Sequence, residues 1–379
     1  MSAAFAIHAE CTRSHARAGL IETRHGAIET PAFMPVGTQA SVKALAPREL
    51  LSAGAQCVLA NTYHLWQRPG ADVVRGAGGL HHFMGWQGPI LTDSGGFQVL
   101  SLRHLCRIDE RGAAFRSHLD GEERTLTPEL AMEVQAGLES DIAMALDVCP
   151  PYPCRSLELL EATERTVRWA RRSLASGHGP GQAVFGIVQG GIDTELRRRA
   201  ASALAAMEFD GYGIGGLSIG EQREATWPAL EAAVAALPPD RPRYLMGVGA
   251  PGDVLKAVAR GVDLFDCVLP TRLGRNGTVL TRQGSLNLHR PGLASRTTPL
   301  EADCDCAACT EFSTGYLHHL VRAGEDLGLR LASLHNIRFL IRLVAEARRA
   351  ICEGEFDEML RRVGGGPHHA AILSGASVS

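Results

Sequence analysis

The sequence predicts an α/β protein with the fold of a (β/α)8 TIM barrel, extended late in the chain by a small subdomain. Short runs rich in Val, Ile and Leu alternate with helical patterns. Eight such units follow one another over about 240 residues, the usual length of such a barrel. The alternation ends near Arg282, where a polar segment carries a cluster of cysteines.

Each predicted strand is short and mostly uninterrupted by polar residues, as strands buried on both faces of a parallel sheet are. The eight strands are expected at Pro31–Val36, Val58–Thr62, Ile90–Asp93, Asp141–Asp147, Ala183–Gln189, Tyr212–Leu217, Tyr244–Val248 and Leu264–Leu269. Two alternatives stay open. Residues Glu22–Pro35 could form an antiparallel hairpin instead of the first strand, and the units could form a doubly wound open sheet.

Helical patterns separate the later strands, and this alternation is typical of a parallel sheet. The chain 1–379 is therefore expected to form a single barrel domain, with a subdomain at about 282–349 and a Gly-, Ala- and Ser-rich disordered tail at 364–379. The predicted helices between strands are Pro128–Leu138, Leu157–Ser176, Asp193–Met207, Ala225–Leu237 and Pro251–Arg260.

Composition excludes some classes of protein. Apolar residues make up 45% of the chain, enough for a large core, yet no run of apolar residues is long enough to cross a bilayer. The N-terminus has no basic region ahead of an apolar segment, so we expect no secretory leader and a cytoplasmic location. Because the net charge is −3, a polyanionic partner would need a local basic patch.

The cysteine cluster indicates a metal site. Ten cysteines in 379 residues are too few for a disulfide scaffold, but Cys304, Cys306 and Cys309 have metal-ligand spacing. Close thiolates need a neutralising cation, and tetrahedral Zn²⁺ supplies it in closed structural sites. The expected fold is therefore a TIM barrel with an inserted or appended zinc-binding subdomain. Candidates for the fourth ligand are His318, His319 and His335, the last near the start of a helix predicted at Leu331–Arg349.

Four polar residues follow apolar runs directly: Asp93, Asp147, Gln189 and Asp266. Any one of them could be a helix cap or a buried hydrogen-bond acceptor. The carboxyl ends of barrel strands meet at one mouth, where barrel enzymes carry out their chemistry. Four such residues on four separate strands therefore favour a shared site.

The two motifs around Asp93 and Asp266 suit glycosyl transfer. Asp93 opens Asp-Ser-Gly-Gly-Phe-Gln, whose glycines allow a sharp turn and a close approach of ligand, and Asp266 lies in Phe-Asp-Cys-Val-Leu-Pro-Thr-Arg. One carboxylate can attack a sugar carbon while the other transfers protons. A separation of about 5 Å gives retention of configuration. Exchange of one base for another on the same face requires that outcome.

A slot for a purine base needs groups that match its edges and faces. A carboxylate accepts from N1–H and the exocyclic amine, and amide or backbone N–H groups donate to O6. An aromatic ring and a thioether stack on the faces. Residues of these types are Asp147, Gln189, the backbone of Gly216 and Leu217, Phe97 and Met246. On composition alone, Met246 would instead belong to the barrel core.

These residues lie in motifs that resemble the bacterial tRNA-guanine transglycosylases, also called queuine tRNA-ribosyltransferases. The resemblance covers nearly the whole chain, and its most specific motifs are TDSGGFQ, FDCVLPTR and CDCAAC. The motifs are TDSGGFQ at 92–98, FGIVQGG at 185–191, YLMGVG at 244–249, FDCVLPTR at 265–272, GGLSIGE at 215–221, NTYHL at 61–65 and CDCAAC at 304–309.

The resemblance implies a role for each matching residue. Asp266 is the nucleophile on ribose C1′, and Asp93 is the general acid/base, with Asn61 beside it. The base is read and enclosed by Asp147, Gln189, Gly216, Leu217, Phe97, Met246 and Gly247. The tRNA is contacted near its wobble base by Arg272, Arg275, Thr271 and Gly247. One structural zinc ion is held by Cys304, Cys306, Cys309 and His335.

The resemblance also implies a reaction and partners. The enzyme would exchange guanine 34 of tRNAs with GUN anticodons for a deazaguanine base in queuosine biosynthesis, and would form a homodimer. Cys149 and Ile219 narrow the expected pocket, whereas eukaryotic members carry glycine in place of Ile219. This favours 7-aminomethyl-7-deazaguanine (preQ1) over queuine. Two residues depart from the common pattern, Phe97 for Tyr and Leu273 for a small or polar residue.

Two rival functions use other features. The glycines at Gly211–Gly220 and Gly247–Gly249 could cradle the phosphate of a sugar phosphate or flavin, although this interpretation leaves the cysteines unexplained. An inactive RNA-binding subunit is the second rival. The presence of both Asp93 and Asp266 argues against it.

Overall fold

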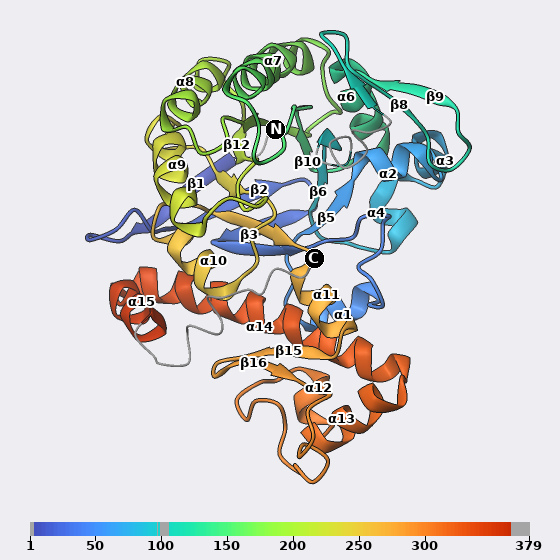
Figure 1. Ribbon diagram of the computed structural model, residues 1–379, viewed down its shortest axis with the longest axis vertical. Coiled ribbons are helices and arrows are strands. Elements are labelled where there is room, and N and C mark those ends of the chain that lie inside the picture. The colour runs from blue at the N-terminus through green and yellow to red at the C-terminus, as the bar shows by residue number, and fades with distance from the viewer. Residues whose placement is uncertain (1–3, 97, 99–105, 365–379) are drawn as a thin grey trace.

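The chain folds around a closed barrel of parallel strands (Figure 1). The computed structural model describes residues 4–96, 98 and 106–364. Its eight-stranded sheet has the order β4, β14, β13, β12, β11, β10, β6, β5, and all the pairs along it are parallel. A parallel bridge between Val36 and Leu59 joins the two outer strands of this order. The predicted TIM barrel is confirmed, and the open doubly wound sheet is excluded.

All eight predicted strands are present. β6 has the predicted bounds, and the other seven are shorter than predicted, chiefly because residues at their carboxyl ends turn into loops around the barrel mouth. The strands are β4 Ala32–Pro35, β5 Val58–Asn61, β6 Ile90–Asp93, β10 Ile142–Met144, β11 Ala183–Val188, β12 Gly211–Ile214, β13 Arg243–Leu245 and β14 Leu264–Cys267.

The helices that separate the later strands match the predicted ranges closely. The local signals are physical: Thr127 caps α6 by accepting from the amide of Leu130, and Asp193 caps α8 by accepting from Glu195 and Leu196. These helices are α6 Pro128–Leu138, α7 Ser156–Ala175, α8 Thr194–Ala205, α9 Arg223–Ala235 and α10 Pro251–Val258. The first two barrel units use shorter helices, α1 Pro47–Ser52, α2 Thr62–Gln67, α3 Ala71–Gly76 and α4 Gly79–Met84. Among the described residues, no helix is long and apolar enough to span a membrane.

Two antiparallel sheets flank the barrel. The first combines β1 Ala4–Glu10, β2 Arg17–Thr23 and β3 Gly26–Thr30. The alternative of a hairpin at Glu22–Pro35 is therefore correct up to Thr30 and wrong beyond it, because Ala32–Pro35 enter the barrel as β4. The second sheet was not predicted; it contains β7 Cys106–Ile108, β8 Ala113–Arg116 and β9 Glu123–Leu126.

The remainder of the described chain forms the cysteine-containing subdomain and the long helix α14, which passes between subdomain and barrel (Figure 1). Helix α14, Asp326–Glu353, is longer at both ends than the predicted Leu331–Arg349, and it ends at Gly354 in the left-handed conformation. The other elements are α11 Leu269–Arg275, β15 Thr278–Thr281, β16 Gly284–Asn287, α12 Ala307–Thr310, α13 Thr314–Ala323 and α15 Phe356–Gly364. The predicted tail begins where α15 ends, and its residues 365–379 lie outside the described ones.

Candidate active site

A cavity of about 340 Å³ opens at the carboxyl ends of the barrel strands. Most of the site residues predicted from the sequence line it, although they come from different strands. Those lining it are Asn61, Asp93, Asp147, Cys149, Gln189, Gly216, Leu217, Ile219, Met246, Gly247, Asp266 and Arg272. The predicted Phe97 lies outside the described residues.

Asp266 is held by two hydrogen bonds to one of its oxygens. The hydroxyl of Tyr244 and the amide of Gly247 each donate to Oδ1 over 2.7 Å. Gly247 has a φ of +74°, in the left-handed region that favours glycine. Because Oδ1 receives both donors, Oδ2 is the oxygen left to react.

Asp93 lies at the end of β6, where its side chain is 8% exposed. The Nδ2 amide of Asn61 donates to its Oδ2 over 2.9 Å. Asn61 also caps α2, because its Oδ1 accepts from the amide of His64. The cap fixes the asparagine, which in turn orients the carboxyl group of Asp93.

Burial and mutual repulsion raise the pKa values of the carboxyl groups in the cavity. Burial, followed by the negative charges of Asp147 and Asp266, raises the pKa of Asp93 to about 7. Burial likewise raises the pKa of Asp147 to about 6 and that of Asp266 above its usual value. The cavity therefore holds a carboxyl group that can both give and take a proton near neutral pH.

Asp147 and Gln189 form a second pair within the cavity. Nε2 of Gln189 donates to Oδ2 of Asp147 over 2.6 Å, and the hydroxyl of Ser94 lies 3.4 Å from Oδ1. Two glycines are required around this pair. A Cβ on Gly96 would lie 2.2 Å from Oδ1 of Asp147, and one on Gly216 would lie 2.3 Å from Oε1 of Gln189.

The residues predicted to contact RNA differ in exposure. Arg272 is exposed at the edge of the cavity, and Arg275 is half-buried one turn further along α11. Thr271 is buried, and its hydroxyl donates to the carbonyl of Val268. The structure thus leaves Arg272 and Arg275 accessible to a nucleic acid but not the side chain of Thr271.

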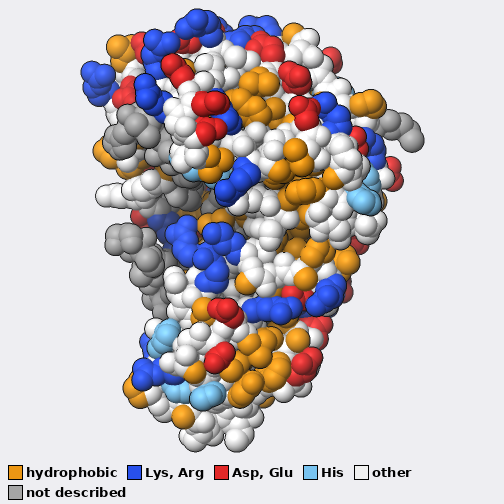
Figure 2. Space-filling view, turned by 90° about the vertical axis from the view of Figure 1, so that its right-hand side faces the viewer, with side chains coloured by type: hydrophobic (Ala, Val, Ile, Leu, Met, Phe, Trp, Pro, Cys, Tyr) orange, Lys and Arg blue, Asp and Glu red, His pale blue; other side chains and the backbone are white. Residues whose placement is uncertain are grey.

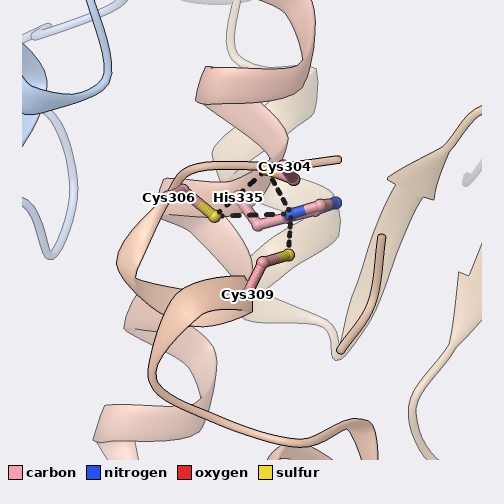
Figure 3. Close-up of side chains that lie close together, drawn as sticks. All are labelled: Cys304, Cys306, Cys309 and His335. Carbon is pink, nitrogen blue, oxygen red and sulfur yellow. Dashed lines mark hydrogen bonds between the residues drawn. The ribbon is translucent and has the colours of Figure 1, made fainter. Parts of the chain in front are cut away.

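Three cysteines and one histidine converge in the subdomain (Figure 3). Nδ1 of His335 lies 3.4–3.7 Å from the sulfurs of Cys304, Cys306 and Cys309, and the sulfurs of Cys304 and Cys306 are 3.5 Å apart. A tetrahedral Zn²⁺ requires S–S and S–N separations of about 3.8 and 3.6 Å. The four ligand atoms lie within 4.8 Å of one another and all four residues are buried, so the group could hold a metal ion.

The second nitrogen of His335 supports this arrangement. Nε2 lies 2.8 Å from the carbonyl oxygen of Leu280, and donation of its N–H there leaves the lone pair of Nδ1 facing the sulfurs. The rival ligands lie elsewhere. His318 contacts the carbonyl of Leu288, and His319 stacks on Tyr316.

His25, His81 and Asp141 also cluster, at the amino-terminal end of the barrel. The two imidazoles contact the two oxygens of Asp141 at 2.8 and 3.0 Å and stack on each other with centroids 3.6 Å apart. Nearly parallel stacked rings do not direct both lone pairs to one ion. The cluster is therefore a hydrogen-bonded staple that ties the β2–β3 turn and α4 to the barrel.

Sequence reasoning missed several residues of the cavity. Tyr244 is the most important, because it binds Asp266. It opens the YLMGVG motif, and the alternation of inward-facing residues along β13 is the signal that could have identified it. The other lining residues that were missed are Val36, Thr38, Leu59, Gln98, Gly215, Ser218, Cys267 and Val268.

Comparison with known proteins agrees with the geometry. The family model described as queuine tRNA-ribosyltransferase matches residues 11–364. A queuine tRNA-ribosyltransferase of Pelotomaculum thermopropionicum is 51% identical over 96% of this chain and 100% of its own length. Proteins of the same name from Moorella thermoacetica and Thermus thermophilus are each 53% identical, over 91% and 94% of this chain and 92% and 93% of their own lengths.

Proposed function

Since the chain belongs to the queuine tRNA-ribosyltransferase family, we propose that it is a tRNA-guanine transglycosylase. It would replace guanine 34 of tRNAs with GUN anticodons by preQ1, a step of queuosine biosynthesis. The observation that carries this proposal is that Asp93 and Asp266 line one cavity at the barrel mouth, where the charge of Asp266 helps to raise the pKa of Asp93.

Asp266 would act as the nucleophile. Oδ2 bonds to ribose C1′ while the C1′–N9 bond breaks, and the electron pair of that bond leaves with guanine. Tyr244 and Gly247 hold Oδ1 during this step, so the carboxylate does not rotate away from the sugar. The product of the first displacement is an ester between Asp266 and the tRNA.

Asp93 would handle the protons of both displacements. In its acid form it protonates N9 of the departing guanine. In its carboxylate form it then takes the N9 proton of the incoming base, whose N9 attacks C1′ and releases Asp266. A pKa of about 7 suits a group that must serve as acid and base in turn. Two displacements return the new base to the original face.

Asp147 and Gln189 would read the base. The carboxylate of Asp147 accepts from N1–H and the exocyclic amine, and Gln189 keeps a second N–H for O6 beside the one given to Asp147. Gly216 and Leu217 border the same cavity with backbone groups, and Met246 offers a thioether. Phe97 would stack on the opposite face of the base.

The cavity suits a small substituent at position 7 of the deazaguanine. Cys149 is buried and Ile219 half-buried, and both line the cavity. Their side chains would compete for space with the cyclopentene ring of queuine. We therefore favour preQ1 over queuine as the incoming base.

The tRNA would lie across a basic face of the protein. Figure 2 shows Lys and Arg side chains across the middle of one face, between the barrel and the subdomain. Arg272 and Arg275 occupy α11, which joins these two parts. The bases of an anticodon loop are single-stranded, so withdrawing guanine 34 from its stack costs little.

The ion at Cys304, Cys306, Cys309 and His335 would be zinc, in a structural role. Four protein ligands leave no open position for a substrate, and the separations fit tetrahedral geometry. The homodimer, the cytoplasmic location and the single-domain organisation stay predictions.

Exchange of labelled guanine into tRNA tests the proposal. We expect incorporation into tRNAs with GUN anticodons, loss of the label when preQ1 is added, and no incorporation when G34 is replaced by A. Queuine should displace the label poorly. Absence of exchange in the wild-type protein, or tight binding of a sugar phosphate or flavin instead, would contradict the proposal.

A further inference from the structure

One arginine next to the cavity has no role in the chemistry described above. Arg197 lies in the first turn of α8 and is 0% exposed. Buried arginines are usually paired with a carboxylate, because an unpaired charge is costly to bury. Within the described part of the chain, no carboxylate forms an ion pair with Arg197, although the charge of Glu221 acts on it from a longer distance.

All three nitrogens of its guanidinium donate to backbone carbonyls instead. Nε donates to Gly191 over 2.8 Å, Nη1 to Val188 over 2.8 Å and Nη2 to Gly216 over 3.1 Å. Val188 is the last residue of β11, Gly191 lies in the loop that follows it, and Gly216 belongs to the loop after β12. A single side chain thus joins two loops that border the cavity.

The positions of these carbonyls allow Arg197 to orient backbone amides of the cavity. The carbonyl of Val188 shares a peptide plane with the amide of Gln189, and that of Gly216 shares one with the amide of Leu217. A peptide plane is rigid and trans, so fixing a carbonyl also fixes the direction of the next N–H. Donation from a cation to a carbonyl further polarises that peptide and strengthens its N–H as a donor.

The glycines near Arg197 allow the loop after β11 to pack closely on α8. A Cβ on Gly190 would lie 2.9 Å from the amide nitrogen of Arg197, so the loop after β11 can rest on α8 only with glycine there. The amide of Gly215 also donates to the carbonyl of Val188 over 3.1 Å. The first residue after β12 is therefore bonded to the same carbonyl at the end of β11 that Arg197 holds.

We propose that Arg197 is a positioning residue for base recognition, which sets the separation of Gln189 from the Gly216–Leu217 peptide. The inference rests on the proposed function, because it assigns to these two loops the reading of guanine and deazaguanine. Arg197 is not among the residues that line the cavity, so it would act through the two peptides that it holds. Its loss should therefore weaken binding of the free base more than it slows chemistry or weakens binding of tRNA.

Arg243 provides a matched control. It is also a buried arginine, 7% exposed, whose side chain donates to backbone carbonyls, those of Gly261 and Pro238. It begins β13, at the end of the barrel opposite the cavity. Arg243→Met removes a comparable buried cation without touching the loops after β11 and β12.

The experiment compares Arg197→Met, Arg197→Lys and Arg243→Met in guanine exchange. For Arg197→Met we expect the KM for guanine to rise about tenfold, the scale of one lost buried hydrogen-bond anchor, with kcat and the KM for tRNA changed less than about threefold. Arg197→Lys should lie between it and the wild type, because an ammonium cannot reach all three carbonyls in the same geometry. Arg243→Met should lower the melting temperature and leave the KM for guanine unchanged.

Equilibrium dialysis of labelled guanine without tRNA distinguishes a failure of the proposed role of Arg197 from a failure of the proposed function. If the wild type fails to exchange guanine, the proposed function falls, whereas the dialysis still tests the effect of Arg197 on base binding. An unchanged KM and an unchanged affinity for guanine in Arg197→Lys would overturn the inference, even if Arg197→Met does not fold. An equal rise in the KM for guanine in Arg243→Met would also overturn it, since the effect would then follow from general destabilisation.

Discussion

The hydroxyl of Tyr244 lies 2.7 Å from Oδ1 of Asp266, inside a barrel whose other inward residues are mostly apolar. Tyr244 itself is 1% exposed, so its ring is packed within the barrel. Burial, followed by the charge and hydrogen bond of Asp266, holds the pKa of Tyr244 well above its usual value. The tyrosine therefore stays neutral and keeps donating to the carboxylate.

The first prediction follows from this contact. Tyr244→Phe keeps the packed ring and removes only the donor, so Asp266 keeps one of its two hydrogen bonds, that from Gly247. We expect the single-turnover rate of formation of the covalent RNA adduct to fall about tenfold, with a small change in tRNA affinity. An unchanged rate of adduct formation would show that the hydroxyl does not position the nucleophile.

The second prediction concerns the stability cost of the carboxylate cluster. In the folded protein the pKa of Asp93 is raised to about 7, against about 3.8 unfolded. Between pH 4 and pH 7 the native state therefore binds more protons at Asp93 than the unfolded state does. The stability that protonated Asp93 contributes is fully present below about pH 4 and is lost as the pH rises to about 7. Asp93→Asn removes this effect.

At pH 8, Asp93→Asn should stabilise the fold by up to about 4 kcal/mol, while at pH 4 the two proteins should differ little. Guanine exchange by the variant should be nearly abolished at both values. Denaturant unfolding at the two pH values measures the difference. A variant that is less stable than the wild type at pH 8 would contradict the account of a destabilised acid/base group.

Much of this site was predictable because each of its polar residues ends an apolar run. Asp93, Asp147, Gln189 and Asp266 follow buried strands, and parallel strands bring their carboxyl ends to one mouth. Residues that act on the site from other parts of the fold could not be predicted in this way. Tyr244 looks like a core residue in the sequence, and Arg197 looks like one of several arginines on an amphipathic helix, next to Arg198 and Arg199.

Boundaries were less predictable than elements. The strands end two or three residues earlier than predicted at β10, β12, β13 and β14, where the chain turns into the loops of the barrel mouth. Helix α14 begins five residues before the predicted Leu331, and this added segment gives little amphipathic signal because it exposes Leu327 and buries Gly328. The strands β7, β8 and β9 have only three or four residues each, too few for a clear periodic signal.

The third prediction concerns the metal. Cys306→Ser should lower the bound zinc from about one ion per chain to far less and destabilise the protein by several kcal/mol, on the order of a lost structural ligand. Cys352→Ser removes an exposed cysteine outside the cluster and serves as the control. Elemental analysis and thermal melting measure the two effects. Full zinc content in Cys306→Ser would contradict the assignment of this ligand.

The fourth prediction concerns the choice of base. Ile219→Gly removes a side chain that lines the cavity, and its neighbour Gly220 already has an unusual backbone conformation. We expect kcat/KM for queuine to rise relative to that for preQ1 by about tenfold, the scale of a few methylene groups in a pocket. Equal ratios in variant and wild type would show that Ile219 does not limit the pocket.

The account depends most directly on a covalent bond between Asp266 and the tRNA. The measurement is a denaturing gel of protein incubated with a GUN tRNA, followed by mass spectrometry of the cross-linked peptide. The wild type and Asp93→Asn should be compared with Asp266→Asn. We predict an adduct in the wild type that maps to Asp266, and none in Asp266→Asn. An adduct of normal yield in Asp266→Asn, or one that maps to Asp93, would contradict the proposed mechanism.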